Sequence, residues 1–119
     1  MSYVDGFVVP VPESNLKSYR SIAQKAGKIW KEHGALHYVE AVGDDLDVKF
    51  GLSFMKALKP KPGETILYSF IIFKSRADRD RVNAKVMSDP RMNKIMESSE
   101  MPFDVKRMCY GGFKSIIDM

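Results

Sequence analysis

The apolar and polar positions in the first part of the chain predict a strand, a helix and a second strand. Residues 4–11 are mostly apolar and rich in β-branched side chains, which favours a strand, and prolines mark its end. Across residues 13–33 apolar side chains recur every three or four positions, which predicts a helix with one apolar stripe. Gly34 suits the position just beyond that helix. Residues 35–42, ALHYVEAV, are typical of a second strand, which ends at a Gly-Asp-Asp turn.

The rest of the chain repeats this order after an interruption. Residues 46–63 show no clean period and end in a proline-containing break, so we expect an irregular insertion. Residues 65–73, TILYSFIIF, are an almost continuous apolar run, which predicts a strand buried on both faces. A serine-capped pattern over residues 75–87 and a shorter one over residues 91–98 predict helices. Residues 104–113 are expected as the last strand.

The order of these elements indicates one domain. Two β-α-β units within residues 1–119 predict an α+β, ferredoxin-like βαββαβ fold with a four-stranded antiparallel sheet. In this fold the first and third strands are central, which agrees with their apolar composition, and charged residues protect the second and fourth strands as edges. A third strand that is apolar on both sides needs helices on one face and a second sheet on the other. We therefore expect a homodimer.

Charge and composition exclude several classes of protein. The net charge is +4 and the pI about 9.2, but basic and acidic residues are interspersed, so nucleic acid is not the expected partner. A local basic run at residues 56–61, KALKPK, leaves open an RNA-associated or protein-interaction module. No apolar run approaches the roughly 20 residues of a membrane span, so no membrane partner is expected. The first residues lack the pattern of a signal peptide, and Cys109 has no second cysteine to pair with, so we expect a cytoplasmic protein.

Residues that bind metals and cofactors are scarce. His33 and His37 are the only histidines and Cys109 is the only thiol, at spacings that do not suit a closed zinc site, so we expect no metal. Gly111 and Gly112 follow a predicted strand but open no helix, which makes them a poor phosphate-binding loop. We expect no cofactor.

One carboxylate and several aromatic residues are the candidates for a ligand pocket. Asp5 lies inside an apolar central strand, so it should find a donor or cation, shift its pKa or emerge at the sheet end. Its expected partner is Arg107 or Lys106 on the neighbouring strand, in a structural salt bridge or a catalytic site. The further candidates for a pocket between sheet and helices are Trp30, His37, Tyr68, Arg107 and Tyr110. The alternative is that these aromatic residues are ordinary core.

Four short stretches resemble a known family. They are YVDGFVV (residues 3–9), GAL..VE (34–40), MSDPRM (87–92) and MPFD.KRM.YGGF (101–113). Together they closely resemble the YbaA-like family, small bacterial proteins of unknown function placed in the dimeric α/β-barrel superfamily. The resemblance implies a ferredoxin-like subunit whose sheet packs face to face with that of a second subunit. The superfamily includes cofactor-free monooxygenases, small isomerases and haem-modifying enzymes, so the resemblance implies a pocket and no particular reaction.

The leading interpretation is a cytoplasmic homodimer with a small-molecule pocket between sheet and helices. The enzymatic alternative is a cofactor-free monooxygenase or isomerase that acts on an aromatic or enolisable substrate. In that alternative Arg107, Tyr110 or His37 would polarise an oxygen or move a proton. A third interpretation, the RNA-associated or protein-interaction module, would use the basic run at residues 56–61.

Overall fold

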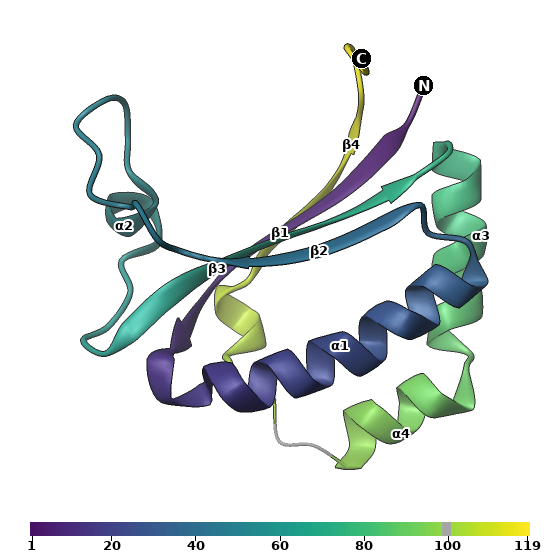
Figure 1. Ribbon diagram of the computed structural model, residues 1–119, viewed down its shortest axis with the longest axis horizontal. Coiled ribbons are helices and arrows are strands. Elements are labelled where there is room, and N and C mark those ends of the chain that lie inside the picture. The colour runs from purple at the N-terminus through teal and green to yellow at the C-terminus, as the bar shows by residue number, and fades with distance from the viewer. Residues whose placement is uncertain (99–100) are drawn as a thin grey trace.

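The chain forms a four-stranded antiparallel sheet, and helices pack against one of its faces (Figure 1). A computed structural model describes residues 1–98 and 101–119. In chain order its elements are β1 (Tyr3–Pro12), η1 (Glu13–Asn15), α1 (Leu16–His33), β2 (His37–Val42), α2 (Phe54–Leu58), β3 (Glu64–Phe73), α3 (Arg76–Met87), α4 (Pro90–Ser98), η2 (Val105–Arg107) and β4 (Cys109–Lys114). The strand order β2-β3-β1-β4 puts the first and third strands at the centre, which confirms the predicted ferredoxin-like α+β fold.

Alternation along the strands gives the sheet two different faces. β1 pairs with β3 over its whole length, with Tyr3 opposite Phe73 and Pro12 opposite Glu64. Successive side chains of a strand point to opposite sides, and the odd-numbered ones of β1 and β3, such as Tyr3, Ile71 and Phe73, are buried against the helices. We call this side of the sheet the helix face and the other side the open face.

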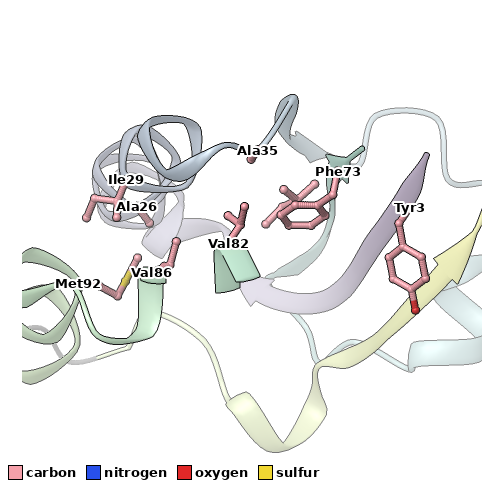
Figure 2. Packing of buried hydrophobic residues seen from close by; sticks show 9 residues of the cluster. Tyr3, Ala26, Ile29, Ala35, Phe73, Val82, Val86 and Met92 are labelled. Atoms are coloured by element: carbon pink, nitrogen blue, oxygen red, sulfur yellow. The ribbon is translucent and has the colours of Figure 1, made fainter. Parts of the chain in front are cut away.

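The main core lies between the helix face and helices α1, α3 and α4. Phe73, Val82 and Val86 are fully buried, and Ile29 and Met92 pack with them (Figure 2). Each helix contributes through the positions that recur every three or four residues, so its apolar stripe faces the sheet. The stripes that the sequence predicts for the two main helices therefore do form the core.

Within a single chain the third strand is buried on one face only, and the prediction assigns the cover of the other face to a second subunit. On the open face Tyr68 is 47% exposed, and Phe70 and Ile72 are only partly buried. Ile66 is the exception at 2% exposed. It lines a small cavity together with Leu46 of the insertion. The open face is thus apolar and largely uncovered.

The insertion at residues 46–63 is irregular, as predicted, except for one short helix. Ser53 begins α2 by accepting a hydrogen bond from the backbone N–H of Lys56. α2 lies beyond one end of the sheet, apart from the other helices (Figure 1). The insertion therefore leaves the helix face free.

The last strand is shorter than predicted. The side chain of Asp104 accepts a hydrogen bond from the backbone N–H of Lys106, and residues 105–107 turn into η2. Such a local side-chain bond competes with the ladder of a sheet. β4 begins only at Cys109, so the predicted strand at residues 104–108 was wrong, and the charges of Asp104, Lys106 and Arg107 lie before the edge strand.

Candidate functional site

A cavity lies between α1 and the β2 edge of the sheet, on the helix face. Its volume is about 810 Å³. Its lining residues are Leu16, Tyr19, Arg20, Ala23, Gln24, Gly27, Lys28, Lys31, Glu32, Tyr38, Glu40, Val42 and Leu67. Cavities of this size hold drug-sized ligands, and most such sites combine apolar walls with a few polar groups. Here the polar groups fall into a floor and a rim.

The floor of the cavity is a carboxylate held by two phenols. Tyr38 and Glu40 are two residues apart in β2, so both side chains point to the helix face. The hydroxyl of Tyr19 on α1 donates to Oε1 of Glu40 at 2.7 Å, and the hydroxyl of Tyr38 donates to Oε2 at 2.6 Å. Each oxygen keeps a further acceptor position, because an ionised carboxylate accepts about four hydrogen bonds.

Both phenols are held in the protonated form. Burial raises the pKa of Tyr19 and of Tyr38, and the neighbouring charge of Glu40 and the hydrogen bonds to it raise it further. Both hydroxyl protons already form hydrogen bonds to Glu40. The floor therefore presents acceptors to a ligand rather than donors.

The rim of the cavity is basic. Arg20, Gln24 and Lys28 follow one another at intervals of four on α1, and all three are exposed. Among the described residues neither Arg20 nor Lys28 lies within ion-pair distance of a carboxylate. The Nζ of Lys31, farther along the rim, donates to the carbonyl oxygen of Leu36 at 2.7 Å.

A glycine lets α1 approach the floor closely. A Cβ at Gly27 would lie 2.7 Å from Cδ1 of Tyr38, so only glycine fits beside that ring. The ring of Trp30, also on α1, stacks on Tyr38 with centroids 5.9 Å apart. Tyr38 is thus fixed by packing as well as by its bond to Glu40.

A second polar cluster surrounds Asp5, which is 1% exposed. Its Oδ1 lies 3.4 Å from Nη1 of Arg79 on α3. Its Oδ2 accepts hydrogen bonds from Asn83 at 3.3 Å and from the hydroxyl of Tyr110 at 3.5 Å. The prediction that Arg107 or Lys106 would be its partner was wrong, because the chain leaves the sheet plane at η2 and α3 brings Arg79 instead.

The contacts of Asp5 are long for a structural ion pair. Among the described residues its Oδ1 accepts no well-formed hydrogen bond, although Arg79 lies close enough for attraction. Burial, the largest influence, raises the pKa of Asp5, while the bond from Asn83 and the charge of Arg79 oppose the rise. The side chain of Trp30 donates to Asn83 at 2.9 Å, which links this cluster to the wall of the cavity.

Arg107 pairs with a different carboxylate, that of Glu64. Its Nη1 and Nη2 donate to Oε2 and Oε1 of Glu64 at 2.8 and 2.9 Å, a two-bond arrangement. The hydrogen bonds from Arg107 are the main reason that the pKa of Glu64 falls to about 2. The pair joins η2 to the start of β3.

The structure does not bring the sequence-predicted pocket residues to one place. Asp5 and Tyr110 share the second cluster, Trp30 lies between it and the cavity, and Arg107 is engaged by Glu64. His37 and Tyr68 lie on the open face, because they alternate with the residues that face the helices.

Sequence reasoning missed the groups that line the main cavity. Tyr19 fitted the apolar stripe of the first helix, and Tyr38 and Glu40 fitted an ordinary edge strand. The sequence did contain one indication of the site. Tyr38 and Glu40 are two residues apart in a strand, so their side chains must lie on the same face of the sheet. That α1 would set Tyr19 against them depends on packing.

Residues 1–98 and 101–119 lack two features, a cluster of metal ligands and a membrane-spanning helix. No group of three or more His, Cys, Asp or Glu side chains is placed to hold a metal ion. No helix is both long enough and apolar enough to cross a membrane.

The fold and the cavity define a ferredoxin-like α+β protein with a pocket on the helix face of its sheet. The chain belongs to the family described as "Protein of unknown function (DUF1428)", whose model matches residues 2–105. It is 48% identical to the uncharacterized protein YbaA of Escherichia coli strain K12 over 118 residues, which are 99% of each chain. The predicted resemblance to the YbaA-like family is therefore confirmed, and the family's function is not known.

Solved structures share the fold at low sequence identity. SnoaB, a cofactor-independent oxygenase from Streptomyces nogalater, matches with a TM-score of 0.63 and 8% identity, over 99% of this chain and 96% of its own. A dimeric ferredoxin-like protein from an uncultured marine organism matches with a TM-score of 0.57 and 9% identity, over 100% of both chains. At such identities the likeness shows the fold alone.

Proposed function

We propose that the protein is a cytoplasmic homodimer that binds a small organic molecule in the cavity between α1 and β2. One observation carries the proposal: Glu40 sits on the cavity floor, fixed by Tyr19 and Tyr38, below apolar walls and a basic rim. An oriented acceptor within an apolar cavity is what gives a ligand site its specificity. In the cytoplasm the exposed thiol of Cys109 would stay reduced.

The open face supports the dimer. Its exposed or partly exposed apolar side chains are Val8, Val39, Tyr68, Phe70, Ile72 and Phe113. A contiguous apolar surface on a sheet is costly in water and marks an interaction site. A second copy of the chain brings an identical apolar face, which a two-fold axis can pair with the first. A dimeric protein of the same fold is consistent with this arrangement.

Occlusion of the cavity tests the ligand site. Val42 lines the cavity and is half exposed, so Val42→Phe should reduce the space without unfolding the strand. Ligands from a screen of small organic molecules, confirmed by calorimetry, should bind the variant at least about tenfold more weakly, a loss of about 1.4 kcal/mol.

The matched control for this test is Val48→Phe, in the exposed insertion, which should bind like the wild type. A screen without any confirmed ligand would count against the proposal. So would ligands that bind Val42→Phe as tightly as they bind the wild type.

A second candidate function is proton transfer at Asp5. The specific observation is a fully buried carboxyl with a raised pKa that accepts a hydrogen bond from the hydroxyl of Tyr110, a half-exposed residue. A carboxyl whose pKa is raised by burial is a better proton acceptor than an exposed one, and it can serve as general base or acid toward an enolisable substrate. This is the enzymatic alternative, with Asp5 in place of Arg107.

Deuterium exchange tests this alternative. In D₂O the protein should speed the incorporation of deuterium beside the carbonyl of α-tetralone, measured by NMR, and Asp5→Asn should abolish the effect. Asp44→Asn, in an exposed turn, is the control and should keep it. Equal rates for the two variants would remove Asp5 from the reaction.

A further inference from the structure

We propose that the ligand of the α1–β2 cavity is an organic anion with an apolar body and a hydrogen-bond donor, such as a hydroxylated aromatic carboxylate. Its acidic group would lie at the rim, near Arg20 and Lys28, and its hydroxyl would donate to Glu40 on the floor. This inference rests on the proposed function, since it names the ligand class of the same cavity.

The rim carries two positively charged side chains that form no ion pair with the described carboxylates. Arg79, Arg81, Arg91 and Arg107 each lie within ion-pair distance of a carboxylate. Arg20 and Lys28 line the cavity, and within residues 1–98 and 101–119 neither has a carboxylate at ion-pair distance.

Among the described residues, the carboxylate of the rim does not pair with these two cations. Glu32 also lines the cavity, but its Oε2 lies 2.7 Å from Nη2 of Arg91, which contacts Asp89 as well, so Glu32 is engaged by Arg91 and not by Arg20 or Lys28. The rim therefore offers a ligand two cations that are unpaired among the described residues, and an anionic group is their complement.

The floor fixes the orientation of the ligand. The hydroxyls of Tyr19 and Tyr38 both donate their hydrogen bonds to Glu40. The floor therefore offers a ligand acceptor oxygens and one negative charge. An acidic group placed there would be repelled, whereas a hydroxyl would find an acceptor. The acidic group must then point outward to the rim and the hydroxyl inward.

The walls determine the body of the ligand. Leu16, Ala23, Val42 and Leu67 present aliphatic surface between floor and rim. An aromatic or alicyclic body gains from leaving water for such walls, at roughly 25 cal/mol per Å² of apolar surface. A small polar metabolite such as inorganic phosphate would leave them unfilled.

The test compares three matched probes by calorimetry at low salt. The first is hydroxybiphenyl carboxylate, with hydroxyl and carboxylate at opposite ends; the second is its neutral amide; the third lacks the hydroxyl. We expect the first to bind about tenfold more tightly than the amide, because only the acid carries a charge that Arg20 and Lys28 attract.

Two pairs of variants assign that preference to named residues. In Arg20→Gln with Lys28→Gln the acid should lose its advantage over the amide. In the matched control, Lys17→Gln with Lys25→Gln, which removes two charges of α1 that do not line the cavity, the advantage should remain. In Glu40→Gln the probe without a hydroxyl should bind more tightly than it does to the wild type, because the repulsive charge is gone.

The outcomes separate this inference from the proposed function. If the amide binds as tightly as the acid, or if both double variants behave alike, the anion class is wrong and the cavity still stands as a ligand site. If the screen yields ligands that are all neutral or cationic, the same conclusion follows. If neither the screen nor the three probes give any binding, both proposals fail.

Discussion

Glu64 and Asp5 each meet an arginine, but the two contacts differ in geometry and in the pKa that they produce. Glu64 receives two short bonds from Arg107, and its pKa falls to about 2. Asp5 lies 3.4 Å from Arg79, and burial raises its pKa. Short hydrogen bonds to a carboxylate favour its ionised form and lower its pKa, whereas burial with only long contacts raises the pKa.

The Arg107–Glu64 pair predicts a pH dependence of stability. The folded-state pKa of Glu64 is about 2 and its ordinary value 4.5, so the stabilisation is full above 4.5 and is lost as the pH falls toward 2. We expect Arg107→Ala to lower the thermal midpoint by about 5 °C at neutral pH, and by much less near pH 2. Thermal unfolding followed by circular dichroism measures both.

Arg76→Ala is the control for this pair, because Arg76 is exposed at the start of α3 and has no carboxylate within ion-pair distance among the described residues. It should leave the midpoint almost unchanged at both pH values. An Arg107→Ala midpoint equal to that of the wild type at neutral pH would contradict a structural role for the pair.

At the scale of elements, the distance between α1 and β2 decides whether the cavity floor exists. Gly27 lets the helix lie against the ring of Tyr38, and that contact brings Tyr19 to Glu40. Two elements that are predictable one by one form a site only through this contact. The shortened β4 is a similar case, because a local bond at Asp104 overrides the strand pattern.

Gly27→Ala should destabilise the protein, against the usual direction of this substitution. Alanine normally favours a helix over glycine by roughly 0.5–1 kcal/mol. Here the new Cβ would lie 2.7 Å from the ring of Tyr38, and overpacking typically costs about 1–3 kcal/mol. We expect a net loss of about 1–2 kcal/mol in urea unfolding.

A double-mutant cycle identifies the cause. In a Tyr38→Ala background the ring is absent, so Gly27→Ala should become neutral or stabilising. If Gly27→Ala destabilised both backgrounds equally, contact with Tyr38 would not be the reason.

At the scale of the whole molecule, the sheet is covered by helices on one face and is apolar on the other. We expect a stable dimer at micromolar concentration, measured by light scattering. Tyr68→Glu, on the open face, should yield monomers, because it places a charge within the paired apolar surfaces. Val105→Glu, similarly exposed but in η2 and outside the strands, should remain dimeric. A monodisperse wild-type monomer would contradict the dimer.

The sequence by itself determined the order of the elements, the central strands and the family. These features depend on local periods, such as the apolar run at residues 65–73, and on which strands avoid water. It could not decide which distant side chains meet. Asp5 was recognisable as a buried charge, but its partner came from α3, and Tyr19, Tyr38 and Glu40 became a floor only when α1 packed on β2. Such contacts join residues far apart in the chain, and only the packing of whole elements fixes their distances.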